Sequence, residues 1–315
     1  MASKQENKIV GSGPGLGKAQ AEAAVAEYWT PERMAAAIPV PMPSVPRGEA
    51  AAEAVKPTGK PGYAEPGHPK AESKAESAGR QEAGQAQPLV AGGKAVANPL
   101  AYPYTTCGKL FFTQGGQNFS GSAAVVAPNV LLTAGHCVFS GGWSTNVAFF
   151  PSYPKRATSD ANYRFSYSYE AAWTAWSQHS NRAYDYGFIW INNDPGHKVG
   201  WLGLLWNAAT SGRTWDAVGY PATPNPPFNG NVMDEALGTV ASSSTSGTIG
   251  LTNDNMEHGS SGGPWVTDFN GSPREYANGL QSFHNHDGDF TEFGPYFTAD
   301  VKGLLDWISN PANRH

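Results

Sequence analysis

Short apolar runs of strand length recur through the last two thirds of this 315-residue chain, and clusters of turn-forming residues separate them. The runs cover residues 122–126, 130–133, 147–150, 188–191, 215–219, 265–266 and 279–283. Pro128 and Asn129 stand between two of these runs and predict a tight hairpin connection. Many short strands with few helical patterns indicate an all-β sandwich or barrel.

Helical spacing is found at the C-terminus and in one N-terminal stretch. Val301, Leu304, Leu305 and Ile308 recur at three- and four-residue intervals, which predicts an amphipathic helix over 299–309 packed on the second half of the β domain. Near the N-terminus, residues 19–28 favour a helix. Thr30, Pro31 and Glu32 supply a cap, a first-turn proline and a first-turn acid for a second short helix that extends through residues 34–37.

Composition divides the chain near residue 97. Only three of the 37 aromatic residues, Tyr28, Trp29 and Tyr63, precede residue 98, and residues 39–96 consist mainly of Ala, Pro, Glu, Lys and Gly. Such a stretch buries too little apolar surface to offset the entropy lost on ordering. We therefore expect residues 1–97 to be a low-complexity leader or pro-segment, largely disordered apart from short helices, followed by a folded domain over 98–315.

Charge and hydropathy limit the classes of partner. Residues 98–315 hold 10 Lys and Arg against 16 Asp and Glu, and the whole chain has a net charge of −5. An acidic domain without a basic stripe argues against nucleic-acid binding. No apolar run approaches the roughly 20 residues of a membrane span, so we expect no membrane partner. Residues 1–8 lack the adjacent apolar stretch of a secretory signal.

Two motifs about 125 residues apart offer a base and a nucleophile. Residues 133–137 read Thr-Ala-Gly-His-Cys, with His136 just past a predicted strand, and residues 259–264 read Gly-Ser-Ser-Gly-Gly-Pro around Ser261. A serine hydroxyl needs an adjacent base, and a buried carboxylate holds the base in its useful tautomer.

Asp185 is the best candidate for that carboxylate, because it opens the apolar run 186–191 and can be buried. Asp160, Asp194 and Asp216 also lie between the two motifs, but the first stands in a polar stretch and the others neighbour turn-type residues. The resulting chain order of His, Asp and Ser differs from the orders of subtilisin-like enzymes and α/β-hydrolases and fits the chymotrypsin-like order.

With these motifs, residues 107–308 resemble a trypsin-like serine peptidase, in particular the bacterial and fungal glutamyl-endopeptidase-type branch. The resemblance implies two six-stranded antiparallel β-barrels and a serine endopeptidase that acts on protein or peptide substrates. It implies His136 as general base, Asp185 as its orienting partner and Ser261 as nucleophile. The main-chain amides of Gly259 and Ser261 would form the oxyanion hole. It implies no cofactor or metal, and it implies export and activation from a zymogen; we further expect a monomer.

Four residues are candidates for substrate binding by the same resemblance. Asn255, six residues before the nucleophile, stands at the expected pocket floor, where an uncharged side chain disfavours preference for Lys or Arg. Gln281 replaces the histidine that glutamyl endopeptidases carry on the pocket strand, so glutamate preference is not implied. Ser282 is expected to contact Asp185 and the substrate backbone, and His284 lines the pocket in one interpretation. In the other, residues 284–289 form a polar surface turn, and a metal site there would lack a defined ligand set.

The resemblance also bears on the two cysteines. Many trypsin-like enzymes have a disulfide from the position after the histidine to a strand about 16 residues earlier, where this chain has Ser120 or Gly121. Cys107 is the other cysteine of the chain, so a Cys107–Cys137 disulfide is expected, with two buried free thiols as the alternative. Two alternatives to a peptidase also remain open: an inactive binding module on the same fold, and a non-proteolytic serine esterase.

Overall fold

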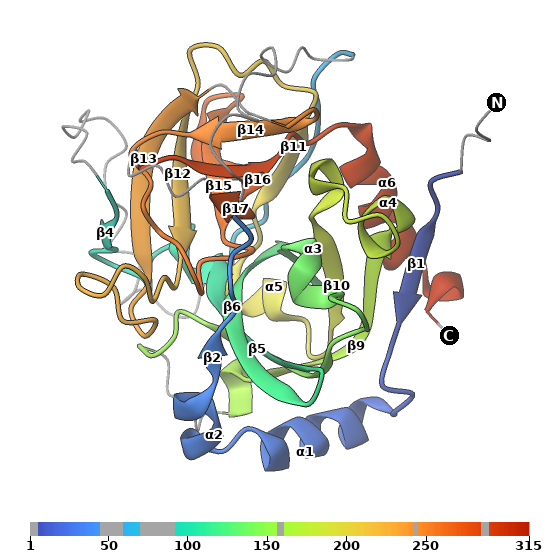
Figure 1. Ribbon diagram of the computed structural model, residues 1–315. Helices are drawn as coiled ribbons and strands as arrows, with labels where there is room; N and C mark the ends of the chain where they lie inside the picture. The colour runs from blue at the N-terminus through green and yellow to red at the C-terminus, as the bar shows by residue number, and fades with distance from the viewer. Residues whose placement is uncertain are drawn as a thin grey trace.

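The computed structural model describes residues 6–44, 59–69, 92–155, 161–241, 245–284 and 290–314. Their strands form two sheets, one in each half of the molecule (Figure 1). The first sheet belongs mainly to residues 107–191, and the second mainly to residues 203–295. The predicted all-β class is confirmed.

Six antiparallel strands of the first half close into a barrel. These are β5 (Cys107–Gln114), β6 (Gln117–Ala127), β7 (Val130–Thr133), β8 (Thr145–Pro151), β9 (Phe165–Trp173) and β10 (Gly187–Ile191). Each pairs with two others, in the closed order β5, β6, β7, β10, β9, β8 and back to β5. Pro128 and Asn129 connect β6 to β7, as the sequence predicts. The first predicted barrel is therefore present, and His136 follows its strand β7.

The second half forms a larger sheet. Its strands are β11 (Gly203–Trp206), β12 (Thr214–Gly219), β13 (Asp234–Ala241), β14 (Thr248–Leu251), β15 (Pro264–Phe269), β16 (Ser272–Leu280), β17 (Phe283–His284) and β18 (Glu292–Pro295). Two short strands from the N-terminal segment extend it: β3 (Gly62–Ala64) pairs with β11, and β4 (Lys94–Ala95) pairs with β13. This half has a hydrophobic cluster separate from the main one. It includes Trp215 and Trp265, whose ring centroids are 6.4 Å apart.

Helices are short and lie outside the sheets. In the domain they are α3 (Gly135–Val138), α4 (Thr174–Ser177), α5 (Pro195–Val199) and α6 (Ala299–Ser309), with 3₁₀ turns η2 (Tyr104–Thr106), η3 (Ala161–Tyr163), η4 (Arg182–Tyr184) and η5 (Pro311–Asn313). The predicted C-terminal helix is confirmed: the Thr298 hydroxyl accepts from the Asp300 amide, and Val301, Leu304, Leu305 and Ile308 are buried. It packs against β9 and β10 of the first barrel as well as β11, rather than on the second half alone.

The described N-terminal residues fold against the domain. The two predicted helices are present as α1 (Lys18–Tyr28) and α2 (Pro31–Ala36), with the Thr30 hydroxyl as N-cap of the second. Two strands that the sequence did not predict flank them: β1 (Ile9–Ser12) pairs with β9, and β2 (Ile38–Pro39) pairs with β6. Residues 45–58 and 70–91, which belong to the stretch predicted to be disordered, lie outside the described residues.

Apolar side chains hold this N-terminal segment in place. Val25, Trp29 and Met34 are buried in one cluster with Phe111 and Phe150 of the first barrel. The Trp29 and Phe111 ring centroids are 5.3 Å apart. Among the residues that the structure describes, no helix is long and apolar enough to cross a membrane.

Candidate catalytic site

His136 lies in α3, directly after β7. Its side chain is buried, with 6% of the residue exposed. Gly135 leaves room for the Asp185 and Trp176 side chains, because a Cβ there would lie 2.9 Å from Asp185 Oδ1 and 2.8 Å from the Trp176 ring. A larger residue at position 135 would therefore push the Asp185 carboxylate away from His136.

Asp185 lies between η4 and β10 and is 1% exposed. Its Oδ1 accepts from the main-chain amide of His136 at 2.8 Å, and its Oδ2 lies 2.9 Å from His136 Nδ1. A carboxylate only accepts, so Nδ1 carries the proton and Nε2 is left free to accept one. Ser282 Oγ also donates to Asp185 Oδ2, at 2.6 Å. Of the four Asp candidates in the sequence, Asp185 is thus the one that the structure brings to His136.

Burial and charge act in opposite directions on the His136 imidazole. Burial disfavours the charged ring, whereas the Asp185 carboxylate and its hydrogen bond favour it. The second effect prevails and raises the pKa of His136 well above its ordinary value.

Ser261 lies in the loop between β14 and β15, which docks on the first barrel. The carbonyl of Ser261 accepts from the Ser122 amide of β6 at 2.9 Å. Gly259 and Gly262 have φ angles of +92° and +85°, in the left-handed region that favours glycine. A Cβ at Gly262 would lie 2.2 Å from Thr133 Oγ1. Gly262 therefore allows the loop to approach the end of β7, just before His136.

The atoms that would exchange a proton are both buried and unpaired in this state. Ser261 is fully buried, and among the residues that the structure describes neither its Oγ nor His136 Nε2 has a hydrogen-bond partner. The geometry therefore holds the base and its carboxylate in contact, with the serine hydroxyl not yet bonded to the base. Catalytic hydrogen bonds commonly tighten only when substrate binds.

The four candidate substrate-binding residues differ in how their side chains are used. Ser282 contacts Asp185, as the resemblance implies. Asn255 Oδ1 accepts from the Gly93 amide at 2.7 Å. Gln281 is fully buried, donates to Asp254 Oδ2 at 2.6 Å and accepts from Trp265 Nε1 at 3.2 Å. Asn255 and Gln281 thus hold internal contacts.

His284 belongs to β17 and is buried rather than part of an exposed turn. Its ring centroid lies 5.9 Å from that of His258, which precedes Gly259. The pocket interpretation of His284 therefore fits its place better than the surface-turn interpretation. The remaining residues of the proposed polar turn, 285–289, lie outside the described residues.

Two buried acids near His284 gave no signal in the sequence. Glu292 pairs across the β17–β18 ladder with His284, and burial, together with Asp254 and Glu257, raises the pKa of its carboxyl well above the ordinary value. Burial raises the pKa of Asp254 to about 7. A local sequence pattern misses both residues because their burial depends on strands that pair far apart in the chain.

The expected Cys107–Cys137 disulfide is wrong. Both cysteines are buried and free. Cys107 opens β5, opposite Ala124, whereas Cys137 faces Gly121, where an added Cβ would lie 3.3 Å from its Sγ. Gly121 and Ala124 are three residues apart on β6, or about 10 Å along the strand. The position that Cys137 faces is thus the one where related enzymes carry the partner cysteine, and this chain has glycine there.

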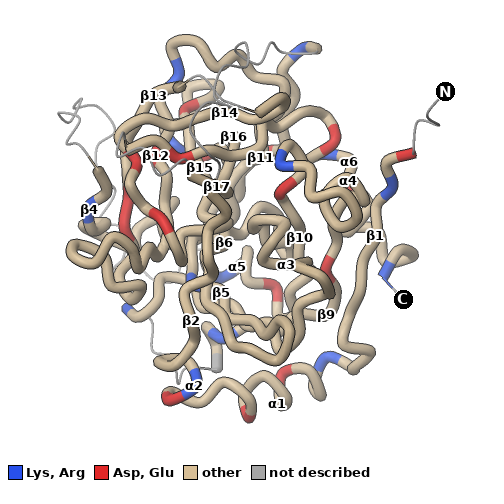
Figure 2. Tube along the Cα trace, in the orientation of Figure 1, with Lys and Arg blue, Asp and Glu red and all other residues tan. Residues whose placement is uncertain are grey.

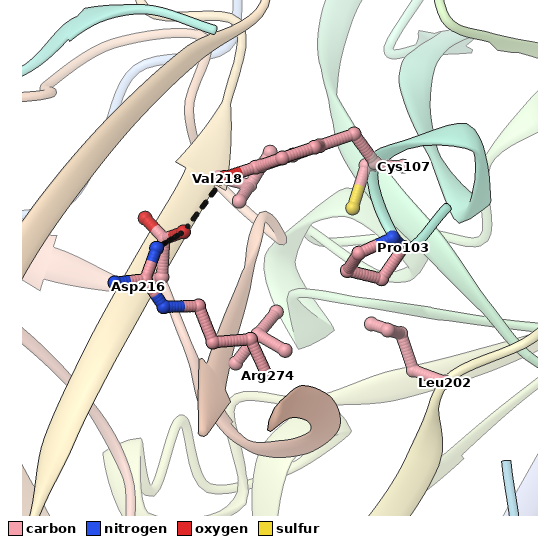
Figure 3. A pocket seen from close by; sticks show the side chains of 8 residues that line it. Pro103, Cys107, Leu202, Asp216, Val218 and Arg274 are labelled. Atoms are coloured by element: carbon pink, nitrogen blue, oxygen red, sulfur yellow. Dashed lines mark hydrogen bonds and ion pairs between the residues drawn. The ribbon is translucent and has the colours of Figure 1, made fainter. Parts of the chain in front are cut away.

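A small pocket near the start of β5 has none of His136, Asp185 and Ser261 in its lining (Figure 3). Its volume is about 10 Å³, enough for one water molecule at most. Asp216 lies beside it and is hydrogen-bonded to the Tyr104 hydroxyl at 3.1 Å, with the Arg274 guanidinium at 3.4 Å. Burial and the neighbouring Glu235 raise the pKa of Asp216 to about 7. Asp216 is therefore buried because it pairs with Tyr104 and Arg274, rather than with His136.

The comparison with protein families matches the trypsin family over residues 93–308, which is more than half of the chain. The chain belongs to the trypsin family. This peptidase also resembles solved structures of serine proteases. The protease Anisep from Arthrobacter nicotinovorans is 31% identical, with a TM-score of 0.57, and the match covers 64% of this chain and 94% of that one.

Two further proteins are similar to this chain. A Glu endopeptidase structure matches with a TM-score of 0.56 over 69% of this chain and 96% of that chain; at 21% identity, it supports the shared fold. An extracellular metalloprotease of Bacillus subtilis (strain 168) is 25% identical over 233 residues, which cover 68% of this chain and 67% of that protein. The resemblance drawn from the two motifs is confirmed, and this trypsin-family member is a serine endopeptidase.

Proposed function

We propose that Ser261 is the nucleophile of this peptidase, with His136 as general base and Asp185 as the residue that orients it. The observation that carries the proposal is the double contact of Asp185 with His136, at 2.8 Å to the main-chain amide and 2.9 Å to Nδ1. It fixes the ring with Nε2 free to take a proton, beside the glycine-framed loop that bears Ser261.

In this mechanism Ser261 Oγ attacks the scissile carbonyl carbon while its proton passes to His136 Nε2. The resulting oxyanion accepts hydrogen bonds from the amides of Gly259 and Ser261, each worth about 3 kcal/mol of transition-state stabilisation. Collapse of the intermediate breaks the C–N bond, and His136 returns its proton to the leaving amine. Water then attacks the acyl-enzyme with the same base, which releases the acid product and restores the hydroxyl.

We assign the peptidase domain to residues 98–315 and a pro-segment to residues 1–97. Support comes from the described N-terminal pieces, which add strands to both halves of the domain and would be present in an unprocessed form. We further propose that the enzyme is secreted, which agrees with the name of the extracellular Bacillus subtilis relative. Its substrates are proteins or peptides.

The distribution of charged residues bears on which classes of molecule the protein can bind. Figure 2 shows Lys and Arg scattered among Asp and Glu in that orientation, without a blue stripe along the strands. This distribution agrees with the expectation that nucleic acid is not a partner. Ser282, which contacts Asp185, is proposed to meet the substrate backbone, and His284, whose ring lies near that of His258, is proposed to line the pocket.

Hydrolysis of a protein substrate, a peptide amide and the matching ester tests the assignment. Ser261→Ala should abolish turnover of all three, and circular dichroism should show an unchanged fold. Ser260→Ala is the matched control, because it removes the neighbouring hydroxyl, whose partners are the carbonyls of Met256 and Glu257. The control should retain turnover. Amide hydrolysis that survives in Ser261→Ala would overturn the role of Ser261, and ester hydrolysis alone in the wild type would indicate an esterase.

A further inference from the structure

Residues 38–44 run from the first barrel across the catalytic loop to the second sheet (Figure 1). We call this segment the strap. It begins as β2, which pairs in parallel with Phe119 and Ser120 of β6. It ends at Ser44, which forms a parallel bridge with His284. Figure 1 shows it in blue, rising past β6 towards β17.

Between these ends, the strap contacts the atoms assigned to substrate binding and catalysis. The amide of Gly259, one of the two proposed oxyanion donors, donates to the carbonyl oxygen of Val40 at 3.2 Å. The amide of His284 donates to the carbonyl of Pro43 at 3.1 Å. A peptide carbonyl of the chain itself thus uses a donor that a scissile carbonyl would need.

The sequence of the strap suits it to this extended course. Prolines at 39, 41 and 43 alternate with Val40 and Met42. Proline fixes φ and lacks an N–H, so the strap has few amides to satisfy and loses little entropy when it binds. Val40 and Met42 lie between the prolines, and both of their amides are used: Val40 donates to the Ser120 carbonyl at 2.8 Å, and Met42 donates to His258 Nδ1 at 2.9 Å.

Side-chain burial follows the same alternation. Val40 is 4% exposed and Met42 is 3% exposed, whereas Pro41 between them faces solvent. Val40 belongs to the main hydrophobic cluster, and its Cγ1 lies 3.4 Å from where a Cβ on Gly121 would stand. The strap is therefore seated by apolar burial as well as by its hydrogen bonds.

The segment before the strap anchors it. Trp29 and Met34 are buried against Phe111 and Phe150, only a few residues upstream of β2. Because the strap is tethered to this cluster, it binds with a high effective concentration, and its occupancy does not depend on protein concentration.

We infer that the strap inhibits the peptidase, leaving a low residual activity, by occupying the peptide-binding surface between β6, Gly259 and His284 as an extended apolar peptide. The inference rests on the proposed role of Ser261. With the strap in place, the Gly259 amide is engaged by Val40, and Ser261 Oγ and His136 Nε2 are buried without a hydrogen bond to each other. Activation then requires that residues 38–44 leave this surface.

Labelling kinetics with a fluorophosphonate probe on the full chain test this. Val40→Arg places a charge in the buried position, and Pro41→Arg places the same charge at the exposed neighbour. Loss of the buried valine contact should shift the equilibrium between the bound and the released strap towards release by roughly 10- to 100-fold. Val40→Arg should therefore label at least about tenfold faster than the wild type, and Pro41→Arg should label at the wild-type rate.

Amide hydrogen exchange of the same chains, carried out in a Ser261→Ala background, shows whether the strap is bound, and this readout does not depend on enzyme activity. The amides of Met42 and Gly259 should be protected in the parent chain and in Pro41→Arg, and should exchange faster in Val40→Arg. Fast exchange in the parent chain would overturn the inference.

The outcomes separate the strap from the catalytic assignment. Equal, fast labelling of all three chains would contradict the inhibitory strap and leave the role of Ser261 intact. Equal acceleration by both arginines would also contradict it, because burial would not matter. If exchange shows that Val40→Arg frees the strap and no chain labels, the role of Ser261 fails, and the inhibitory role of the strap fails with it.

Discussion

Asp185 accepts two hydrogen bonds from His136, one from the main-chain amide at 2.8 Å and one from Nδ1 at 2.9 Å. The first ties the carboxylate to the backbone of α3, and the second fixes the tautomer of the ring. Asp185 therefore positions His136 by its place in the fold as well as by charge.

Asp185→Asn should lower kcat by about 10⁴-fold while leaving the domain folded. The new amide can donate to Nδ1, which leaves the proton on Nε2 and removes the base that Ser261 needs. Asp194→Asn is the matched control, because the Asp194 side chain is 44% exposed and contacts His197 at the N-terminus of α5. An unchanged kcat in Asp185→Asn would contradict the positioning role.

The pH profile should change with the same substitution. In the proposed mechanism neutral His136 is the active base, so kcat/KM should rise as pH rises through its pKa, which Asp185 holds above the ordinary value. In Asp185→Asn, which lacks that carboxylate, the acid limb of the kcat/KM profile of the residual activity should move to lower pH. Steady-state rates on a fluorogenic peptide between pH 4 and 9 measure the limb; a limb that stays in place, or moves to higher pH, would show that Asp185 does not set this pKa.

Gly121→Cys should form a disulfide with Cys137. The Cβ of such a residue would lie 3.3 Å from Cys137 Sγ, close to the separation found across a disulfide. Closing this loop of about 16 residues should stabilise the protein by about 3 kcal/mol in the chain-entropy model. Thiol titration and denaturant unfolding, with and without reductant, measure both effects. Gly121→Ala is the control for the added Cβ; three free thiols in unfolded, oxidised Gly121→Cys would disprove the contact.

Stability should fall as pH rises from about 4 to about 7. Burial raises the pKa of Asp234 to about 7, and the pKa values of Asp216 and Asp254 are also about 7. Between the ordinary Asp pKa and 7, the folded state binds more protons than the unfolded chain, so folding is favoured on the acid side of this range.

Asp234→Asn should flatten this dependence, because it removes one of the three carboxyls. Urea unfolding at several pH values, in a Ser261→Ala background that prevents self-digestion, measures the change. Asp306→Asn on the exposed face of α6 is the control. The same slope in Asp234→Asn and its parent would contradict the assignment of that carboxyl.

The motifs around His136 and Ser261 indicated the candidate site because they are local: each places a polar side chain beside a strand end or between glycines. Asp185 was also predictable, since an acid that opens an apolar strand is easily buried. The disulfide prediction failed because the identity of the residue facing Cys137 depends on the register of β6, which a count of cysteines does not contain. The strap escaped notice because its prolines and small apolar residues resemble a linker until β6 and His284 supply its partners.

Peptide-mapped fluorophosphonate labelling of the wild-type and Val40→Arg chains tests the central claim most directly. We expect one adduct per chain, located on Ser261 rather than Ser260, absent in Ser261→Ala and strongly reduced in His136→Ala. Labelling at another residue, or unimpaired labelling in His136→Ala, would contradict a serine activated by the His136–Asp185 pair.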